Sequence, residues 1–261
     1  MTTIGLIASL PEEIKPFLKR VGKHERTRLG PFPAYRFRLH GEECLLVEAG
    51  MGLKRAMEAA EILLAGENPR MLVSFGVAGG VEEGLTVGDV VLADGVCLLE
   101  QGELTQVLPL FTPSEEAFQR TVDTLQKVDV RLVNGTSITT RGIMDKRLVA
   151  KILPHGLSHP VLEMETAGIA LRAGEKGTPL LALRGISDPA GEELDFSIDE
   201  FTDQELNIRI GKVLATILRR PRIIPQLARL ARNTGKAAEN LAEALIAVIG
   251  EMSPHLNPDQ H

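Results

Sequence analysis

The chain has 261 residues, of which 44% are hydrophobic and 25% are charged, and this composition predicts a folded protein with a sizeable buried core. The formal net charge of −6 argues against general nucleic-acid binding. We find neither a secretory signal pattern nor an apolar run of about 18 residues, so we expect a cytoplasmic protein. Cys44 and Cys97 lie in apolar strand-like runs, which predicts buried thiols in a reducing compartment.

The first part of the chain alternates apolar runs of strand length with helical patterns. Thr3–Leu10 predicts a strand, and Pro11 with the acidic pair after it predicts the start of a helix. Tyr35–Leu39 and Cys44–Glu48 flank a short turn and predict a hairpin, and Lys54–Leu64 has helical spacing. The alternation favours an α/β fold.

The middle of the chain continues this alternation. Met71–Phe75 and Val87–Ala93 predict two strands separated by a glycine-rich loop, Gly76–Gly84. Three further strands and three helices are expected at Leu132–Val133, Val161–Glu163, Leu180–Leu183, Ser114–Lys127, Asp145–Leu153 and Thr166–Lys176. Short connections favour an α/β sandwich with a mostly parallel sheet, which the early hairpin makes mixed. Active residues should collect where the strands end.

The C-terminal part predicts a separate basic helical extension. We expect a catalytic domain over residues 1–207, the extension packed on it over 208–252, and a frayed tail over 253–261. Pro221 and Pro225 interrupt the helical stripes Ile210–Leu218 and Leu241–Ile249. From Ile208 to Lys236 the chain has eight Lys or Arg and no acid. A solvated face or a subunit contact is the preferred interpretation, and weak contact with an anionic membrane surface is the alternative.

The sequence lacks the motifs that are typical of several classes of catalytic site. Among the six histidines, only His155 and His159 have HxxxH spacing, none have HxH spacing, and they are not accompanied by cysteine pairs, which argues against a zinc site. The chain has no GxSxG elbow, no GxxxxGK[ST] loop and no GxGxxG fingerprint. We therefore expect no metal and no cofactor, and the remaining candidates are carboxylates at strand ends.

Polar and glycine-rich stretches follow several of the predicted strands. Leu10–Glu13 follows the first, Ser74–Gly80 follows or ends another, and Glu163–Glu165 and Arg184–Asp188 follow later ones. The glycines would let the backbone approach a ligand closely, or would only form a tight turn. On an extended segment the two glutamates share a face, and a lone acid could equally be a helix cap or an ion-pair partner.

Taken together, these stretches resemble the nucleoside phosphorylase superfamily, and most of all the methylthioadenosine and S-adenosylhomocysteine nucleosidases. The matching segments are IGLIASLPEE from Ile4, GMG from Gly50, FGVAGG from Phe75, LTVGD from Leu85, LEMETA from Leu162 and RGISD from Arg184. The resemblance extends from about Thr3 to about Lys212. It implies a three-layer α/β/α sandwich and a homo-oligomer whose sites are completed across subunits.

The resemblance also implies roles for individual residues. Glu13 would be the base that activates the attacking water, Asp188 would protonate or hydrogen-bond the purine N7, and Arg184 would place Glu13 and its water. Glu165 would bind the ribose hydroxyls beside Met164. The other implied substrate-binding residues are Ala78, Gly79, Ile138, Glu163 and Ser187. Such a set suits C–N cleavage, which forms an oxocarbenium-like sugar and a base that is protonated as it departs.

Two departures from the family bear on the substrate and the acceptor. Where phosphorylases hold phosphate with an Arg-Val-Gly-Ser pattern, this chain has Ser74-Phe75-Gly76-Val77, which favours hydrolysis over phosphorolysis. Val77 also replaces the serine of the methylthioadenosine nucleosidases, and Ile138 falls where they place a base-stacking Phe.

We expect an adenine-nucleoside hydrolase that acts on a small-molecule substrate. One alternative is a phosphorylase, including a hopanoid-associated enzyme that releases adenine from a lipid nucleoside. Another is a futalosine-type hydrolase. An alternative of a different class is an inactive nucleoside-binding module, which the set of acids disfavours.

Overall fold

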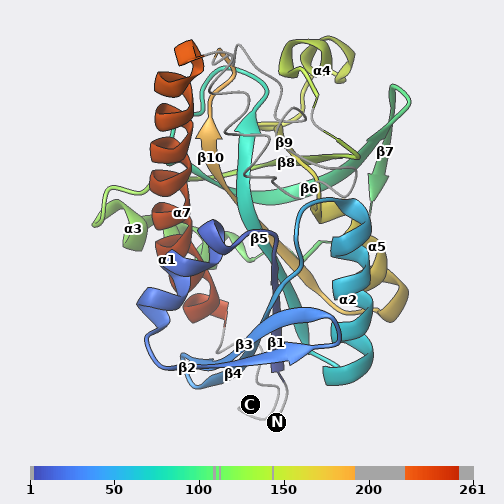
Figure 1. Cartoon of the computed structure of the whole chain (residues 1–261), viewed down its shortest axis with the longest axis vertical. Helices are drawn as coiled ribbons and strands as arrows, with labels where there is room; N and C mark the ends of the chain where they lie inside the picture. The colour runs from blue at the N-terminus through green and yellow to red at the C-terminus, as the bar shows by residue number, and fades with distance from the viewer. Residues whose placement is uncertain (1–2, 108–109, 112, 143, 192–220, 253–261) are drawn as a thin grey trace.

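The computed structural model describes residues 3–107, 110–111, 113–142, 144–191 and 221–252, which form a central sheet covered by helices on both faces (Figure 1). Four parallel strands form its middle, in the order β4 (Glu42–Glu48), β1 (Thr3–Ala8), β5 (Met71–Gly80) and β10 (Leu180–Asp188). Because these strands run the same way, their carboxyl ends lie at one edge of the sheet.

The remaining strands extend this middle on both sides. The hairpin of β2 (His24–Leu29) and β3 (Phe32–Leu39) adds antiparallel to β4. On the other side, β6 (Val90–Glu100) pairs with β10 and with β8 (Leu132–Thr140), while β7 pairs with β6. The short β9 (Val161–Glu163) joins β8 to β5. The strands β5, β10, β6, β8 and β9 therefore close on themselves like a small barrel.

The helices fall into two layers. One layer consists of α1 (Pro11–Val21), α3 (Glu115–Gln126) and α7 (Ile224–Met252), and the other of α2 (Leu53–Glu67) and α5 (Thr166–Lys176), while α4 (Lys146–Ile152) is a short additional helix (Figure 1). Side chains alternate across β1, so that Leu6 packs in the core cluster with the first layer and Ile7 in the cluster with the second. The predicted three-layer α/β/α fold with a mixed sheet is confirmed.

Several strands are longer than predicted, including β8, which was expected only over Leu132–Val133, and two strands were not predicted. The segment Gly76–Gly80, expected as a loop, continues β5 because its backbone pairs with β10 and β9. β6 likewise runs on to Glu100 beside β8. Strand β2 and strand β7 (Glu103–Val107) lie at the sheet edges with mostly exposed side chains, so their sequences carry little apolar alternation.

The C-terminal helix α7 begins just before Pro225 and contains the second predicted stripe, Leu241–Ile249. Pro225 lies in the first turn, where the missing N–H has no helical partner to lose, and Pro221 begins a 3₁₀ turn, Pro221–Ile223. Further along, Leu241 and Leu245 are buried in the main core cluster. A Cβ on Gly185 of β10 would lie 2.7 Å from the Ala237 carbonyl oxygen, so the helix packs directly on the sheet.

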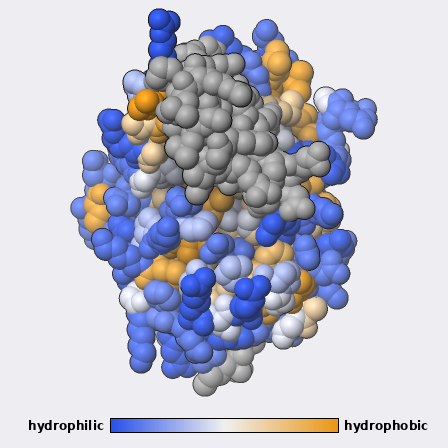
Figure 2. Space-filling model, in the orientation of Figure 1, coloured by the Kyte–Doolittle hydropathy of each residue, from blue (hydrophilic) through white to orange (hydrophobic). Residues whose placement is uncertain are grey.

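Much of the predicted basic extension lies outside the described residues, including the stripe Ile210–Leu218 and the tail 253–261. The domain boundary at 207 stays a prediction. Within the described part, four members of the basic run are exposed on or just before α7: Arg222, Arg229, Arg232 and Lys236. None of the described helices combines the length and apolar character needed to span a bilayer. On the face shown in Figure 2, the coloured apolar residues form small patches among hydrophilic ones.

Candidate active site

The predicted site residues gather around the carboxyl ends of β1, β5, β9 and β10. Glu13 follows β1 and bonds to the backbone of β5, while Glu165 begins α5 and bonds to the residue that precedes α2. Asp188 ends β10 and lies over Gly79 of β5. This edge of the sheet is where open α/β folds bind their ligands.

The Glu13 carboxylate is buried and is held entirely by backbone N–H groups. Its Oε2 accepts from Ser9 N at 3.0 Å and Leu10 N at 2.9 Å, and its Oε1 accepts from Val77 N at 2.9 Å. A Cβ on Gly76 would lie 2.7 Å from Oε1, so this approach requires glycine. Burial raises the pKa of Glu13, although these bonds and the Arg184 charge oppose the rise. A fixed carboxylate with a raised pKa suits a general base.

Arg184 forms a buried ion pair with Glu163, although we expected it to contact Glu13. Its Nη2 donates to Glu163 Oε2 at 2.9 Å and to Ser74 Oγ at 2.8 Å, and also to Thr166 Oγ1. The Arg184 guanidinium therefore affects Glu13 only through its charge, whereas backbone N–H groups hold the Glu13 carboxylate in position. Glu163 ends β9, and its carboxylate meets the Arg184 side chain of β10 directly, whereas Glu13 is bonded to the backbone N–H of Val77 in β5.

Glu163 is saturated with hydrogen bonds and stays charged. Besides Arg184, its carboxylate accepts from the hydroxyls of Thr139 and Thr166 and from the backbone N–H groups of Glu165 and Thr166. Burial raises its pKa, but Arg184 and these hydroxyls outweigh burial, and the net pKa is lowered. These hydrogen bonds all come from protein groups, so Glu163 holds neighbouring site residues in position.

Glu165 stands at the start of α5, where the chain bends away from the extended path that we expected. Its Oε1 accepts from Gly52 N at 2.8 Å and its Oε2 from Met164 N at 3.2 Å. Burial, together with the charges of Glu163 and Glu13, raises the pKa of Glu165 to about 7. This carboxyl can therefore exchange its proton near neutral pH.

Asp188 forms an ion pair that the sequence did not predict. Lys146 Nζ, from the first residue of α4, lies 2.7 Å from Asp188 Oδ2, and Ser187 Oγ donates to Oδ1 at 2.7 Å. A Cβ on Gly79 would lie 2.7 Å from Asp188 Oδ2, so glycine is required there too. The structure thus brings together Gly79 and Asp188, which were both predicted as site residues, and adds the Lys146 cation.

The other expected contact positions are less exposed to a ligand. Ile138 is fully buried in a cluster with Cys97, Leu99 and Val149, so the structure describes it as a core residue of β8. The Ala78 carbonyl accepts from Ser187 Oγ at 3.4 Å, which ties β5 to β10. Met164 contributes its N–H to Glu165.

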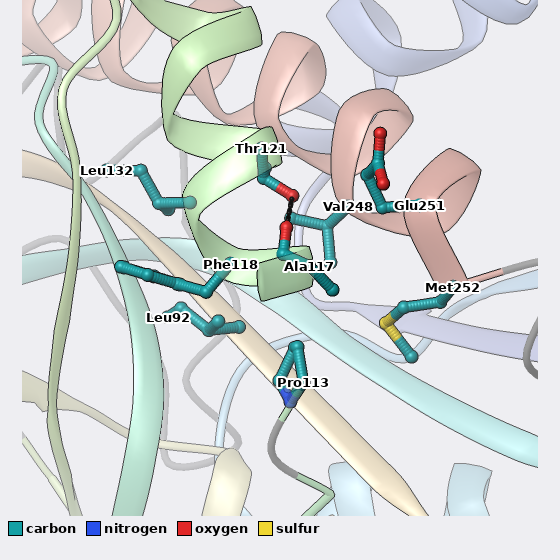
Figure 3. A pocket seen from close by; sticks show the side chains of 9 residues that line it. All are labelled: Leu92, Pro113, Ala117, Phe118, Thr121, Leu132, Val248, Glu251 and Met252. Atoms are coloured by element: carbon teal, nitrogen blue, oxygen red, sulfur yellow. Dashed lines mark hydrogen bonds between the residues drawn. The ribbon is translucent and has the colours of Figure 1, made fainter. Parts of the chain in front are cut away.

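A shallow hollow elsewhere on the molecule is unrelated to these carboxylates. It lies between α3 and α7, and Figure 3 shows that its walls are mostly apolar, with Phe118, Leu132 and Met252 among them. None of the predicted site residues lines it. Among the described residues, no group of three or more His, Cys, Asp or Glu side chains is placed to hold a metal ion.

Comparison with known protein families identifies the family to which this chain belongs. The family model described as "Phosphorylase superfamily" matches residues 3–219, which includes every site residue described above. The chain belongs to the phosphorylase superfamily. The match covers β1 to β10 and ends before α7.

Similar superfamily members are nucleosidases by name. The chain is 26% identical over 228 residues to the 5′-methylthioadenosine/S-adenosylhomocysteine nucleosidase of an Exiguobacterium species, covering 83% of this chain and 97% of that protein. Solved structures share the fold: futalosine hydrolase of Helicobacter pylori has a TM-score of 0.70 at 17% identity, covering 96% of this chain and 98% of that one. The adenine-bound Colwellia psychrerythraea nucleosidase has a TM-score of 0.71 at 18% identity, covering 96% and 95%.

Two features of this superfamily member's site escaped sequence analysis. The first is Lys146, although a lysine in the first turn of a helix opposes the helix dipole and is an anomaly that sequence can reveal. The second is the set of hydroxyls around the buried pair, from Ser74, Thr139 and Thr166. Their spacing along the chain gives no indication that they converge on one ion pair.

Proposed function

We propose that this chain hydrolyses the N-glycosidic bond of a purine nucleoside, with an adenine nucleoside such as methylthioadenosine or S-adenosylhomocysteine as substrate. The observation that carries the proposal is the placement of two acids along β5. Glu13 lies against Gly76 and Asp188 against Gly79, three residues further along the strand. Three residues of extended chain span about 10 Å, which is comparable to the length of a sugar with its base.

The proposed reaction uses these two acids at opposite ends of the substrate. Glu13 takes a proton from water, whose oxygen forms the new bond to C1′ of the ribose. The C1′–N9 bond breaks, and its electron pair leaves with the purine, whose N7 is protonated or hydrogen-bonded at Asp188. Glu165 accepts hydrogen bonds from the ribose hydroxyls, and its charge stabilises the oxocarbenium-like sugar. No cofactor or metal takes part in this proposal.

Water as the acceptor is supported by the way the remaining donors are used. A phosphate dianion needs positive charge or several aligned donors to offset its desolvation. In the structure the Ser74 hydroxyl accepts from Arg184, the Val77 N–H donates to Glu13, and the Arg184 guanidinium is paired with Glu163. Most of the donors near the positions where phosphorylases hold phosphate are therefore used within the protein, and the buried Arg184 Nε–H is the one without an acceptor among the described residues.

The named relatives favour the same substrate class. The curated relatives of 26–28% identity are methylthioadenosine/S-adenosylhomocysteine nucleosidases, and this supports an adenine nucleoside. A futalosine-type substrate stays an alternative, since that neighbour shares the fold. The lipid nucleoside, the homo-oligomer, the cytoplasmic location and weak membrane contact through the basic residues before and within α7 also stay predictions.

The test is release of free base, followed by chromatography after incubation with methylthioadenosine, S-adenosylhomocysteine and adenosine. Glu13→Gln and Asp188→Asn should each lower turnover by about a hundredfold or more while substrate still binds, in line with typical general acid–base contributions. Wild-type turnover by either variant would remove the role assigned to that residue. A wild-type protein that binds these nucleosides but releases no base would be a binding module instead.

A further inference from the structure

We propose that Lys146 is a positioning residue that fixes the Asp188 carboxylate for the departing purine base. This role rests on the function proposed above, because it concerns the group that faces the leaving base. Nothing in the family resemblance assigns a lysine to this place. The geometry of three elements, α4, β5 and β10, points to it.

The Lys146 ammonium is bound by three oxygens at the end of β10. Its Nζ donates to Asp188 Oδ2 at 2.7 Å, to the Asp188 carbonyl at 3.3 Å and to the Pro189 carbonyl at 2.8 Å. An ammonium has three N–H donors, so these acceptors use all of them. Lys146 therefore has no N–H left for a substrate, and it acts through Asp188.

The ion pair between Lys146 and Asp188 is largely buried, and Gly79 packs closely beneath it. The Lys146 side chain is 14% exposed and the Asp188 side chain 30% exposed, so the ion pair is largely withdrawn from water. Beneath it, a Cβ on Gly79 would lie 2.7 Å from Asp188 Oδ2 and 3.2 Å from Lys146 Cδ. The lysine also occupies the first turn of α4, where the helix dipole disfavours a cation. The ion pair with Asp188 explains why a lysine occupies this position, which is unfavourable for α4 itself.

The pair restricts the direction of the Asp188 carboxylate. Oδ2 is held by Lys146 and Oδ1 by Ser187 Oγ, so both oxygens are anchored on the protein side. The lone pairs that remain point in fixed directions, and the hydrogen bond that the N7–H of the protonated purine donates to one of them depends strongly on direction. Without Lys146, Oδ2 loses its anchor and the carboxylate can turn away from the base.

The test compares Lys146→Met, which keeps the apolar part of the side chain, with Lys151→Met at an exposed site on the same helix. Turnover of methylthioadenosine by Lys146→Met should fall about tenfold or more, with KM changed less than about threefold. Lys151→Met should match the wild type. Because Lys146 acts through Asp188, adding Lys146→Met to Asp188→Asn should cause little further loss, whereas its effect should multiply with that of Glu13→Gln.

The results of these assays distinguish the positioning role of Lys146 from the proposed function of the chain. Wild-type turnover by Lys146→Met, or a loss that multiplies with that of Asp188→Asn, overturns the positioning role and leaves the proposed function intact. A wild-type chain that releases no base overturns the proposed function and this role with it. Thermal unfolding shows whether each variant is folded. If Lys146→Met does not fold, Lys146→Gln enters the same comparison with the same two deciding results.

Discussion

The guanidinium of Arg184 lies 2.9 Å from the carboxylate of Glu163, and the two side chains are 2% and 0% exposed. This pair joins β10 to the last residue of β9, and Glu165 follows two residues later, just before α5. Arg184 also lowers the pKa of Glu163, against the effect of burial. Arg184 therefore holds Glu163 and the chain segment that leads to Glu165, and it influences the pKa of Glu13 only through its charge.

Removing one partner of this pair should destabilise the fold strongly. Arg184→Met would leave the Glu163 carboxylate buried and without its charge partner, which typically costs about 3–5 kcal/mol of the free energy of unfolding. Denaturant unfolding measures the loss, and Glu163→Gln/Arg184→Met should recover part of it because the isolated charge is removed. A loss below about 1 kcal/mol, as for an exposed ion pair, would show that the pair is not buried as described.

Gly76→Ala should damage catalysis more than folding. The added Cβ would lie 2.7 Å from Glu13 Oε1, so the carboxylate must move from its three N–H donors. A displacement of about 1 Å can cost a hundredfold in rate, and we expect turnover to fall at least tenfold. The control is Gly235→Ala in α7, where an added Cβ meets nothing within 4 Å. Equal turnover by the two alanine variants would contradict the placement of Glu13.

The raised pKa of Glu165 makes stability depend on pH in a definite direction. The folded-state pKa of about 7 exceeds the ordinary value of 4.5, so folding retains a proton between these values. The stabilisation from the protonated form is present below 4.5 and is lost as pH rises through about 7. Glu165→Gln, which mimics the protonated form, should therefore raise the unfolding temperature relative to wild type more at about pH 8 than at about pH 5.

An exposed glutamate provides the comparison for that experiment. Glu58→Gln on the outer face of α2 should show the same small difference from wild type at both pH values. A Glu165→Gln effect that is independent of pH, or that is larger at low pH, would mean that Glu165 is ionised throughout the range.

Much of the fold follows from patterns that act over a few residues. Apolar runs in β1, β4 and β10 and caps such as Ser114 before α3 fix these elements locally, and the predictions there were confirmed. The extension of β5 through its glycines could not be predicted in this way. Glycine normally weakens a strand, and here the pairing with β9 and β10 overrides that preference.

The site was predictable where a residue belongs to a motif and not where tertiary contacts choose its partner. Glu13 and Asp188 were predicted as site residues from their motifs, and the structure places both against β5, while their roles stay predictions. The partner of Arg184 could not be deduced, because Glu163 and Glu13 are both acids near strand ends and only the sheet order separates them. Lys146 lies 42 residues from Asp188, so no local pattern connects the two.

The most direct test of the account is whether base release needs phosphate. Purified protein is incubated with methylthioadenosine in phosphate-free buffer and in the same buffer with millimolar phosphate, and the sugar product is identified by mass spectrometry. The use of the Val77 N–H and the Arg184 Nη2 within the protein, with Val77 in place of a phosphate-binding serine, predicts equal rates of adenine release and an unphosphorylated C1′ hydroxyl on the methylthioribose product. Strict dependence on phosphate, with a sugar 1-phosphate as product, would contradict it.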